Sequence, residues 1–225
     1  NTQWKDRNLT KSVTTGQGDS GDTDVIFLKG IGQKHQGLEI EGSMKLNDIV
    51  RLDGAVSFGK WKFDGDADGL YTEYAEDAPI QTPYTYTLDG LYVGDQPQTA
   101  YVLGTTLTPM DGLRLQGIFK MYDKNYADWS PDSRELSGDA DRSQVWQAPA
   151  YNRLDLHASY KLPKIAGYDM TLTGHLFNAL DAVYVQDAVD NSQYNGFGDK
   201  LHLAHNAEVF LGTPRYFNLG LTVNF

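Results

Sequence analysis

Three aspartates at alternate positions are the residues of this 225-residue sequence whose spacing best suits a metal ion. Asp64, Asp66 and Asp68, followed directly by a glycine, match the first half of a calcium-binding loop. Ca²⁺ prefers oxygen ligands, and the glycine permits the sharp turn that such loops need. The last position of the loop, where a Glu would complete the ligands, falls on Ala75. We therefore favour a solvated acidic loop in residues 63–97 and keep calcium binding as the sharper hypothesis.

Aromatic side chains gather in the long segments between the predicted strands. We expect Tyr84, Tyr86, Tyr126 and Trp129 to contact a ligand, because such rings stack on ligands at the mouth of a binding site. Two plainer interpretations compete with this one. The loops could pack on themselves, or the rings could form a belt at the level of the lipid headgroups.

Catalytic chemistry finds no support in the sequence. It has no cysteine, no Gly-x-Ser-x-Gly elbow, no His-Glu-x-x-His motif and no phosphate-binding glycine loop. His202 and His205 are three residues apart, which on a strand would point them to opposite faces, and the other three histidines are scattered. We interpret all five as ordinary polar histidines, and we predict no enzymatic activity and no cofactor besides the candidate Ca²⁺.

The elements that would carry these residues alternate apolar and polar side chains with a period of two, which is typical of β-strands. Residues 154–162 place Leu154, Leu156, Ala158 and Tyr160 on one face, and the intervening polar residues on the other. We predict a bend near residues 30–32, inside the second of eight strands. The predicted strands are 3–13, 24–46, 49–62, 98–108, 113–123, 151–162, 168–178 and 215–225.

The connections between these strands alternate in length. Short reversals lie at 47–48, 109–112 and 163–167, whereas the segments near 14–22, 63–97, 124–150 and 179–214 are long. Short turns at one end, long loops at the other and alternating strands of about ten residues predict an all-β, antiparallel transmembrane barrel. A soluble β-sandwich that binds carbohydrate through its loop aromatics remains the alternative, because one buried face per sheet also produces alternation.

Charge separates along the same division. The chain carries 19 Lys and Arg against 30 Asp and Glu, a net charge of −11. The four long segments together hold −16, which leaves +5 for the strands and short turns. This acidic rim disfavours nucleic acid. It favours a neutral or cationic ligand and divalent-cation bridges to lipopolysaccharide.

Several runs resemble the end of a TonB-dependent outer-membrane receptor, closest to those of Bacteroidota that take up iron complexes. They are residues 153–156, 176–184 and 212–215, followed by a final alternating strand; Gly37-Leu38-Glu39 and Trp4-Lys5-Asp6-Arg7 resemble earlier strands of the same family. The residues that carry the resemblance at the C-terminal end are Arg153, Asp155, Asn178, Asp181, Gly212, Pro214, Arg215 and Phe225.

The resemblance implies a barrel of about 22 strands around an N-terminal plug, driven from the inner membrane by TonB, ExbB and ExbD. On this basis residues 1–225 form the C-terminal part of the barrel, about its last eight strands, and the plug and TonB box are absent from this chain. The expected partners are the remaining strands, the plug and outer-membrane lipid. The expected function is active uptake of a scarce nutrient, an iron–siderophore or similar metal complex, into a Gram-negative bacterium. A self-contained eight-stranded barrel with a structural or adhesive role is the alternative.

Overall fold

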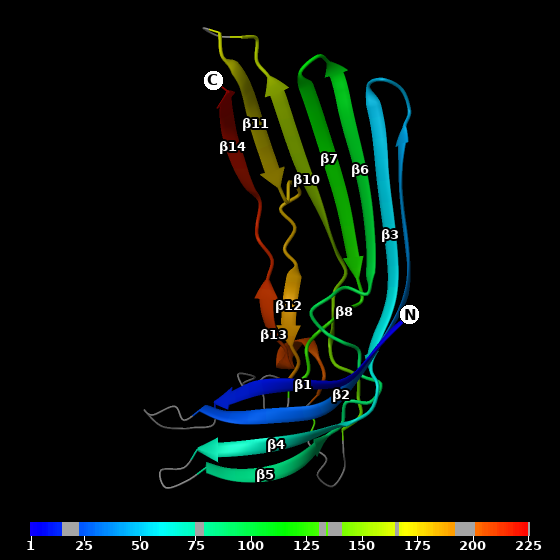
Figure 1. The fold of residues 1–225 in the computed structure, drawn as a ribbon, viewed down its shortest axis with the longest axis vertical. Helices are drawn as coiled ribbons and strands as arrows, with labels where there is room; N and C mark the ends of the chain where they lie inside the picture. The colour runs from blue at the N-terminus through cyan, green and yellow to red at the C-terminus, as the bar shows by residue number, and fades with distance from the viewer. Residues whose placement is uncertain are drawn as a thin grey trace.

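The chain forms one large curved antiparallel sheet with a compact group of loops at one end, as Figure 1 shows for the computed structural model. The structure describes residues 1–14, 23–74, 79–130, 134, 141–164, 167–191 and 201–224. In these residues the only helix is a single 3₁₀ turn at Ala204–Asn206. No helix in the described part of the chain is long and apolar enough to cross a bilayer.

All eight predicted strands are present within a few residues of their expected bounds. Six further short strands lie inside the segments that the sequence predicts only as long connections. The strands are β1 (Thr2–Thr14), β2 (Thr23–Lys45), β3 (Val50–Phe63), β4 (Ala67–Tyr74), β5 (Pro79–Tyr86), β6 (Thr99–Met110), β7 (Leu113–Asp123), β8 (Asn125–Tyr126), β9 (Gln147–Ala148), β10 (Tyr151–Lys161), β11 (Asp169–Phe177), β12 (Val185–Val189), β13 (Glu208–Leu211) and β14 (Tyr216–Asn224).

The main sheet is a meander in which each strand pairs with the next long strand along the chain. From the far edge the order is β14, β11, β10, β7, β6, β3 and β2, and beyond the bend β2 continues to β4 and β5, with β1 on its other side. We call β3, β6, β7, β10, β11, β14 and residues 33–45 of β2 the wall. Among the described strands the wall does not close on itself, because β14 pairs only with β11 and residues 36–45 of β2 pair only with β3.

The register of the wall collects the predicted apolar positions on one uninterrupted face. Leu38 lies opposite Phe58, Leu103 opposite Phe119, and Leu156 opposite Leu176. Nothing among the described residues covers this face. Its exposed side chains are Leu38, Ile40, Met44, Phe58, Tyr101, Leu103, Leu115, Phe119, Met121, Leu156, Leu172, Phe217, Leu219 and Leu221.

The buried core lies at the loop end and not behind the wall. A sandwich would bury the apolar face of each sheet against a second sheet. Here the buried cluster comes from the start of β2 and from the long connections, so the sandwich interpretation is wrong. The cluster comprises Ile26, Leu28, Ile31, Phe63, Ala67, Tyr86, Leu88, Leu91, Trp129 and Val145.

The bend predicted in β2 is confirmed and separates these two regions. Gly30 has a φ of +71°, which lies in the left-handed region that glycine adopts without steric cost. The register of β1 against β2 shifts on either side of the pair Arg7 and Ile31. Beyond this point β1, the first part of β2, β4 and β5 run across the end of the wall (Figure 1). We call the described residues of 25–31, 63–98 and 125–148 the loop body.

Candidate functional site

Two of the four aromatics predicted to contact ligand lie in the core of the loop body. Tyr86 and Trp129 have 0% and 1% of their surface exposed, and their ring centroids are 6.0 Å apart. Trp129 also meets Phe63 edge-on at 6.5 Å. This packing favours the alternative of loops that pack on themselves for these two residues. Tyr84 and Tyr126 are half-buried at the margin of the same core, and ligand contact stays a prediction for them.

Tyr126 lies in a stack that connects the loop body to the wall. Its ring lies 4.1 Å from that of Tyr92, nearly parallel, and the Lys62 ammonium lies 4.4 Å from the Tyr92 ring centroid. Burial, followed by the neighbouring Tyr92, raises the pKa of Tyr126 to about 12. The Tyr126 phenol is therefore neutral at physiological pH, and the Lys62 cation above Tyr92 interacts with the ring face.

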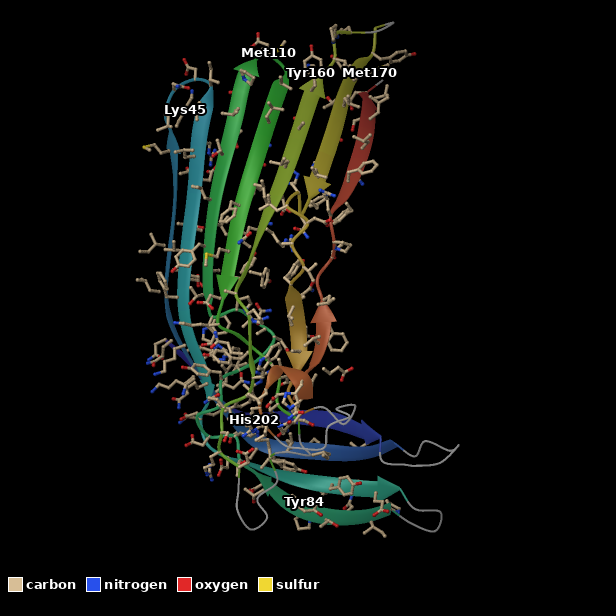
Figure 2. All side chains as sticks on the ribbon, turned by 180° about the vertical axis from the view of Figure 1, so that it is seen from behind. Lys45, Tyr84, Met110, Tyr160, Met170 and His202 are labelled. Atoms are coloured by element: carbon tan, nitrogen blue, oxygen red, sulfur yellow. The ribbon has the colours of Figure 1, made fainter. Side chains whose placement is uncertain are left out.

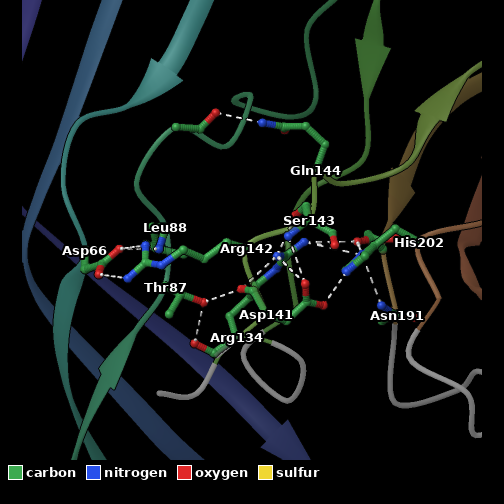
Figure 3. Close-up of polar contacts among 12 residues, drawn as sticks. Asp66, Thr87, Leu88, Arg134, Asp141, Arg142, Ser143, Gln144, Asn191 and His202 are labelled. Atoms are coloured by element: carbon green, nitrogen blue, oxygen red, sulfur yellow. Dashed lines mark hydrogen bonds and ion pairs between the residues drawn. The ribbon is translucent and has the colours of Figure 1, made fainter. Parts of the chain in front are cut away.

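A buried charge cluster links the loop body to the segment 179–214 (Figure 3). His202 donates from Nε2 to Asp141 at 2.6 Å, and its Nδ1 donates to Asp190. The Arg134 guanidinium, which has no exposed surface, lies 3.7 Å from Asp190 and donates to the Ser143 carbonyl at 2.7 Å. Both ring nitrogens face carboxylates, an arrangement that favours the doubly protonated imidazole. Arg134 and Asp190 are fully buried in this cluster, whereas the Asp141 side chain keeps 31% of its surface exposed.

Opposing effects set the pKa values in this cluster. Burial lowers the pKa of His202, but hydrogen bonds from its ring to Asp190 and Asp141 outweigh burial, so that the net pKa is raised. For Asp141 burial raises the pKa, yet the hydrogen bonds from His202 and from the Ser143 amide bring it below its usual range. Burial lowers the pKa of Arg134, and the nearby Asp141 and Asp190 carboxylates act in the opposite direction. The cluster is thus mutually stabilised at neutral pH.

The three aspartates of the candidate calcium site each have a partner within the chain. Asp66 accepts two hydrogen bonds from Arg142, at 2.7 and 3.1 Å, and others from the amides of Leu88 and Asp89. The bond from Arg142 is the main reason that the pKa of Asp66 is lowered. Asp64 accepts from Gln3, and Asp68 from Thr85. These four bonds to the Asp66 carboxylate organise the loop.

The described residues of this region also form no larger cluster of metal-ligating side chains. In the part of the chain that the structure describes, no group of three or more His, Asp or Glu side chains is arranged to hold a metal ion. The Ala75 position lies outside the described residues. Calcium binding by Asp64, Asp66 and Asp68 therefore stays a prediction.

The residues that carry the family resemblance meet at the loop end of β10 and β11. Asp155 is 2% exposed and accepts from Lys120 at 2.9 Å and from the Asn178 amide at 2.9 Å. Arg153 donates to the Tyr184 hydroxyl at 2.9 Å, with its guanidinium over that ring. Asn178 adopts a φ of 48°. Its side-chain amide donates to the carbonyls of residues 182 and 213 and accepts from the N–H of residue 182. These contacts hold the exit from the wall in place.

The remaining signature residues fasten the return to the last strand. Asp181 accepts from the Arg215 amide at 3.0 Å, and its carboxylate lies 3.6 Å from the Arg215 guanidinium. A Cβ on Gly212 would lie 1.9 Å from the Tyr184 ring, so that only glycine fits there. Pro214 occupies the last connection before β14, and Phe225 lies outside the described residues. The signature is a structural junction, with no open site of its own.

The comparison with known families decides what this architecture is. A family model described as TonB dependent receptor-like, beta-barrel matches residues 4–179, most of the chain. The chain belongs to the TonB-dependent receptor β-barrel family. The expected fold of antiparallel transmembrane barrel strands is thereby confirmed, and proteins of this family lie in the outer membrane of Gram-negative bacteria. A search of curated proteins finds no match to the chain.

Membership orients the receptor barrel in its membrane. Outer-membrane barrels have short turns on the periplasmic side and long loops outside. Lys45, Met110, Tyr160 and Met170 therefore mark the periplasmic end in Figure 2, and Tyr84 and His202 mark the extracellular end. The exposed apolar face of the wall meets lipid. The other face, with Glu39, Glu41, Arg51, Asp53 and the signature pair Arg153 and Asp155, faces the lumen.

Sequence reasoning missed the charge cluster because its members are far apart in the chain. Arg134 and His202 are separated by 68 residues, and no periodic pattern joins the segments that hold them. His202 is thus no ordinary polar histidine. One usable signal was the charge content of the segment 124–150, where Arg134 is one of three cations among five acidic residues, since cations among carboxylates form internal ion pairs.

Proposed function

We propose that this receptor barrel is the C-terminal part of a transporter that takes up a scarce nutrient, an iron–siderophore or similar metal complex. The observation that carries the proposal is a lipid-facing wall that ends in a packed, acidic extracellular loop body. Such a cap, on strands with a charged lumen face, suits the mouth of a pore that admits a polar solute. The family match supports transport in general, and the iron complex is our inference.

The open wall supports a larger barrel over a self-contained one of eight strands. A strand edge in lipid exposes backbone groups that hydrocarbon cannot satisfy, at a cost of several kcal/mol for each group. The edges at β14 and at residues 36–45 of β2 therefore call for further strands. We propose that these strands and a plug, acting with TonB, ExbB and ExbD, complete the transporter.

The charge of the loops narrows the cargo. Residues 63–97 carry eight acidic side chains and no Lys or Arg. A strongly anionic complex would be repelled at this rim, whereas a neutral or cationic complex would be attracted. We therefore propose a complex without net negative charge, with Tyr84 and Tyr126 as the candidate contacts.

An uptake assay in the source bacterium tests the proposal. Cells that express the receptor, and cells from which its gene is deleted, are given ⁵⁵Fe bound to siderophores of negative, zero and positive net charge. We expect accumulation of a neutral or cationic complex only with the receptor, and its loss when TonB is deleted or a protonophore is added.

Two results would overturn parts of this proposal. Equal accumulation of all the complexes with and without the receptor would remove iron complexes as cargo. Accumulation that persists without TonB would contradict energised transport and favour a self-contained barrel.

A further inference from the structure

Two histidines meet on the lumen face of the wall. His157 of β10 and His175 of β11 are directly paired across the two strands, and their Nδ1 atoms are 2.8 Å apart. The pair lies in a row of polar side chains that crosses the wall. Gln116 faces His157 from β7, and Asn218 faces His175 from β14. Strand pairing fixes this approach, because both imidazoles project from rigid, neighbouring backbones.

The surroundings hold both rings in place. Phe177, two residues beyond His175 on the same face, contacts His157 edge-on at 5.5 Å and stacks on His175 at 6.0 Å. Tyr216 stacks on the far side of Phe177 at 4.7 Å. The carboxylate of Asp155, which acts on His157, is already paired with Lys120 and Arg153, and Arg114 is a further cation near this histidine. The ring positions are therefore set by packing and not by a charged partner.

Imidazole nitrogens that converge in this way are suited to a borderline metal ion. Two nitrogens bound to one ion at about 2.0–2.1 Å each lie about 3 Å apart, close to the separation found here. Imidazole suits Zn²⁺, Ni²⁺ and Cu²⁺, and Cu²⁺ binds most tightly among them. Water and the amide oxygens of Gln116 and Asn218 would complete the coordination from the lumen.

We propose that His157 and His175 form a binding site for a divalent transition-metal ion on the lumen wall, with Cu²⁺, Ni²⁺ and Zn²⁺ as its ligand class. Each histidine supplies one neutral nitrogen, and binding displaces any proton shared between the two rings. This proposal can be tested separately from the proposed cargo, because the affinity for the metal ion is measured without transport.

Copper titration of the receptor extracted from its outer membrane tests the site. Calorimetry should show one strong Cu²⁺ site, and its EPR spectrum should show coupling to two nitrogens. His157→Asn and His175→Asn should each weaken binding by more than about tenfold, since even partners outside the ligand shell change metal affinity by about 10–100-fold. The copper affinity of the double variant should be no lower than that of each single variant. His35→Asn is the matched control, because His35 also lies on a strand but bonds Gln33 instead of a histidine.

A second measurement uses the unaltered chain, in case a variant fails to fold. Zn²⁺ should protect residues 157 and 175, and not residue 35, from modification by diethyl pyrocarbonate, read by peptide mass spectrometry. Copper affinity of the double variant equal to that of the unaltered receptor, or modification of both residues at an unchanged rate with Zn²⁺, would overturn the site. The pair would then be two imidazoles that share a hydrogen bond.

Discussion

The wall and the loop body follow opposite rules of burial within one chain. In the wall, large apolar side chains are exposed and charged ones line the other face; Leu38 and Ile40 are each 57% exposed. In the loop body, apolar side chains are buried as in a soluble domain, with Leu88 and Tyr86 at 0%. The difference follows from the two solvents. Exposing a Leu side chain to hydrocarbon costs little free energy, whereas exposing it to water is unfavourable.

The same contrast governs what holds each region together. The wall relies on backbone pairing along its strands, and the side chains on its apolar face meet lipid. The loop body relies on packing and on internal ion pairs such as those of Arg134 and Asp66. Substitutions should therefore have opposite consequences in the two regions, which the following predictions use.

The largest effect is expected from Trp129→Ala. It removes a fully buried ring from the core of the loop body, which should lower the free energy of local unfolding by about 3–5 kcal/mol. Hydrogen exchange read by mass spectrometry should quicken in residues 63–98 and stay unchanged in the wall. Trp4→Ala is the control, since that ring is 50% exposed. Equal quickening in β10 and β11 would show that the two regions are not separate units.

A charge on the lipid face should be nearly as costly. Val56→Arg places a guanidinium on that face, and membrane insertion should lose about 2–4 kcal/mol. The next residue provides the matched control, because Ala55→Arg faces the lumen opposite Glu41. Folded yield in lipid vesicles, read from heat-modifiable mobility on a gel, measures both. Similar losses for the two variants would break the distinction between the faces.

The attachment of the segment 179–214 to the loop body should weaken as pH rises. Because the folded-state pKa of His202 is raised, its contribution is complete below the ordinary histidine pKa of about 6.5 and is lost as pH rises through the folded value. Proteolysis of the segment 179–214 should therefore quicken as pH rises through the folded-state pKa of His202. His202→Gln should remove this dependence. A dependence of the same size in that variant would place the titrating group elsewhere.

The smallest effect is expected at the rim, at Arg142→Gln. This side chain is 52% exposed, and its pair with Asp66 is open to screening by salt. Exchange at residues 87–89 should change less than in Asp66→Asn, which also weakens the bonds to the Leu88 and Asp89 amides. A larger effect for Arg142→Gln would mean that the ion pair, and not the loop-capping carboxylate, organises this loop.

The sequence predicts the wall well because its signal is local. A period of two places Leu154 and Leu156 on one face whatever the rest of the chain does, and the short reversals set the order of pairing. The bend at Gly30 was equally accessible, since an internal glycine in a strand indicates a break. The wall therefore follows from patterns within a dozen or so residues.

The loop body and its sites could not be predicted in this way. The cluster of Arg134, Asp141 and His202 and the core around Trp129 depend on contacts between segments that no period connects. The pair of His157 and His175 is an intermediate case. Both residues fall on predicted strands of one hairpin, but the pattern of the sequence does not fix the register that places them opposite each other.

The most direct test of the two-solvent account is a nitroxide scan of residues 51–58 in lipid vesicles. The chain has no cysteine, so each position can be labelled singly through an introduced cysteine. We predict that access to oxygen peaks at 52, 54, 56 and 58 and access to a water-soluble nickel complex at 51, 53, 55 and 57. If the even-numbered positions were closed to both reagents, the result would contradict the account, because it would mean that the apolar face packs against protein.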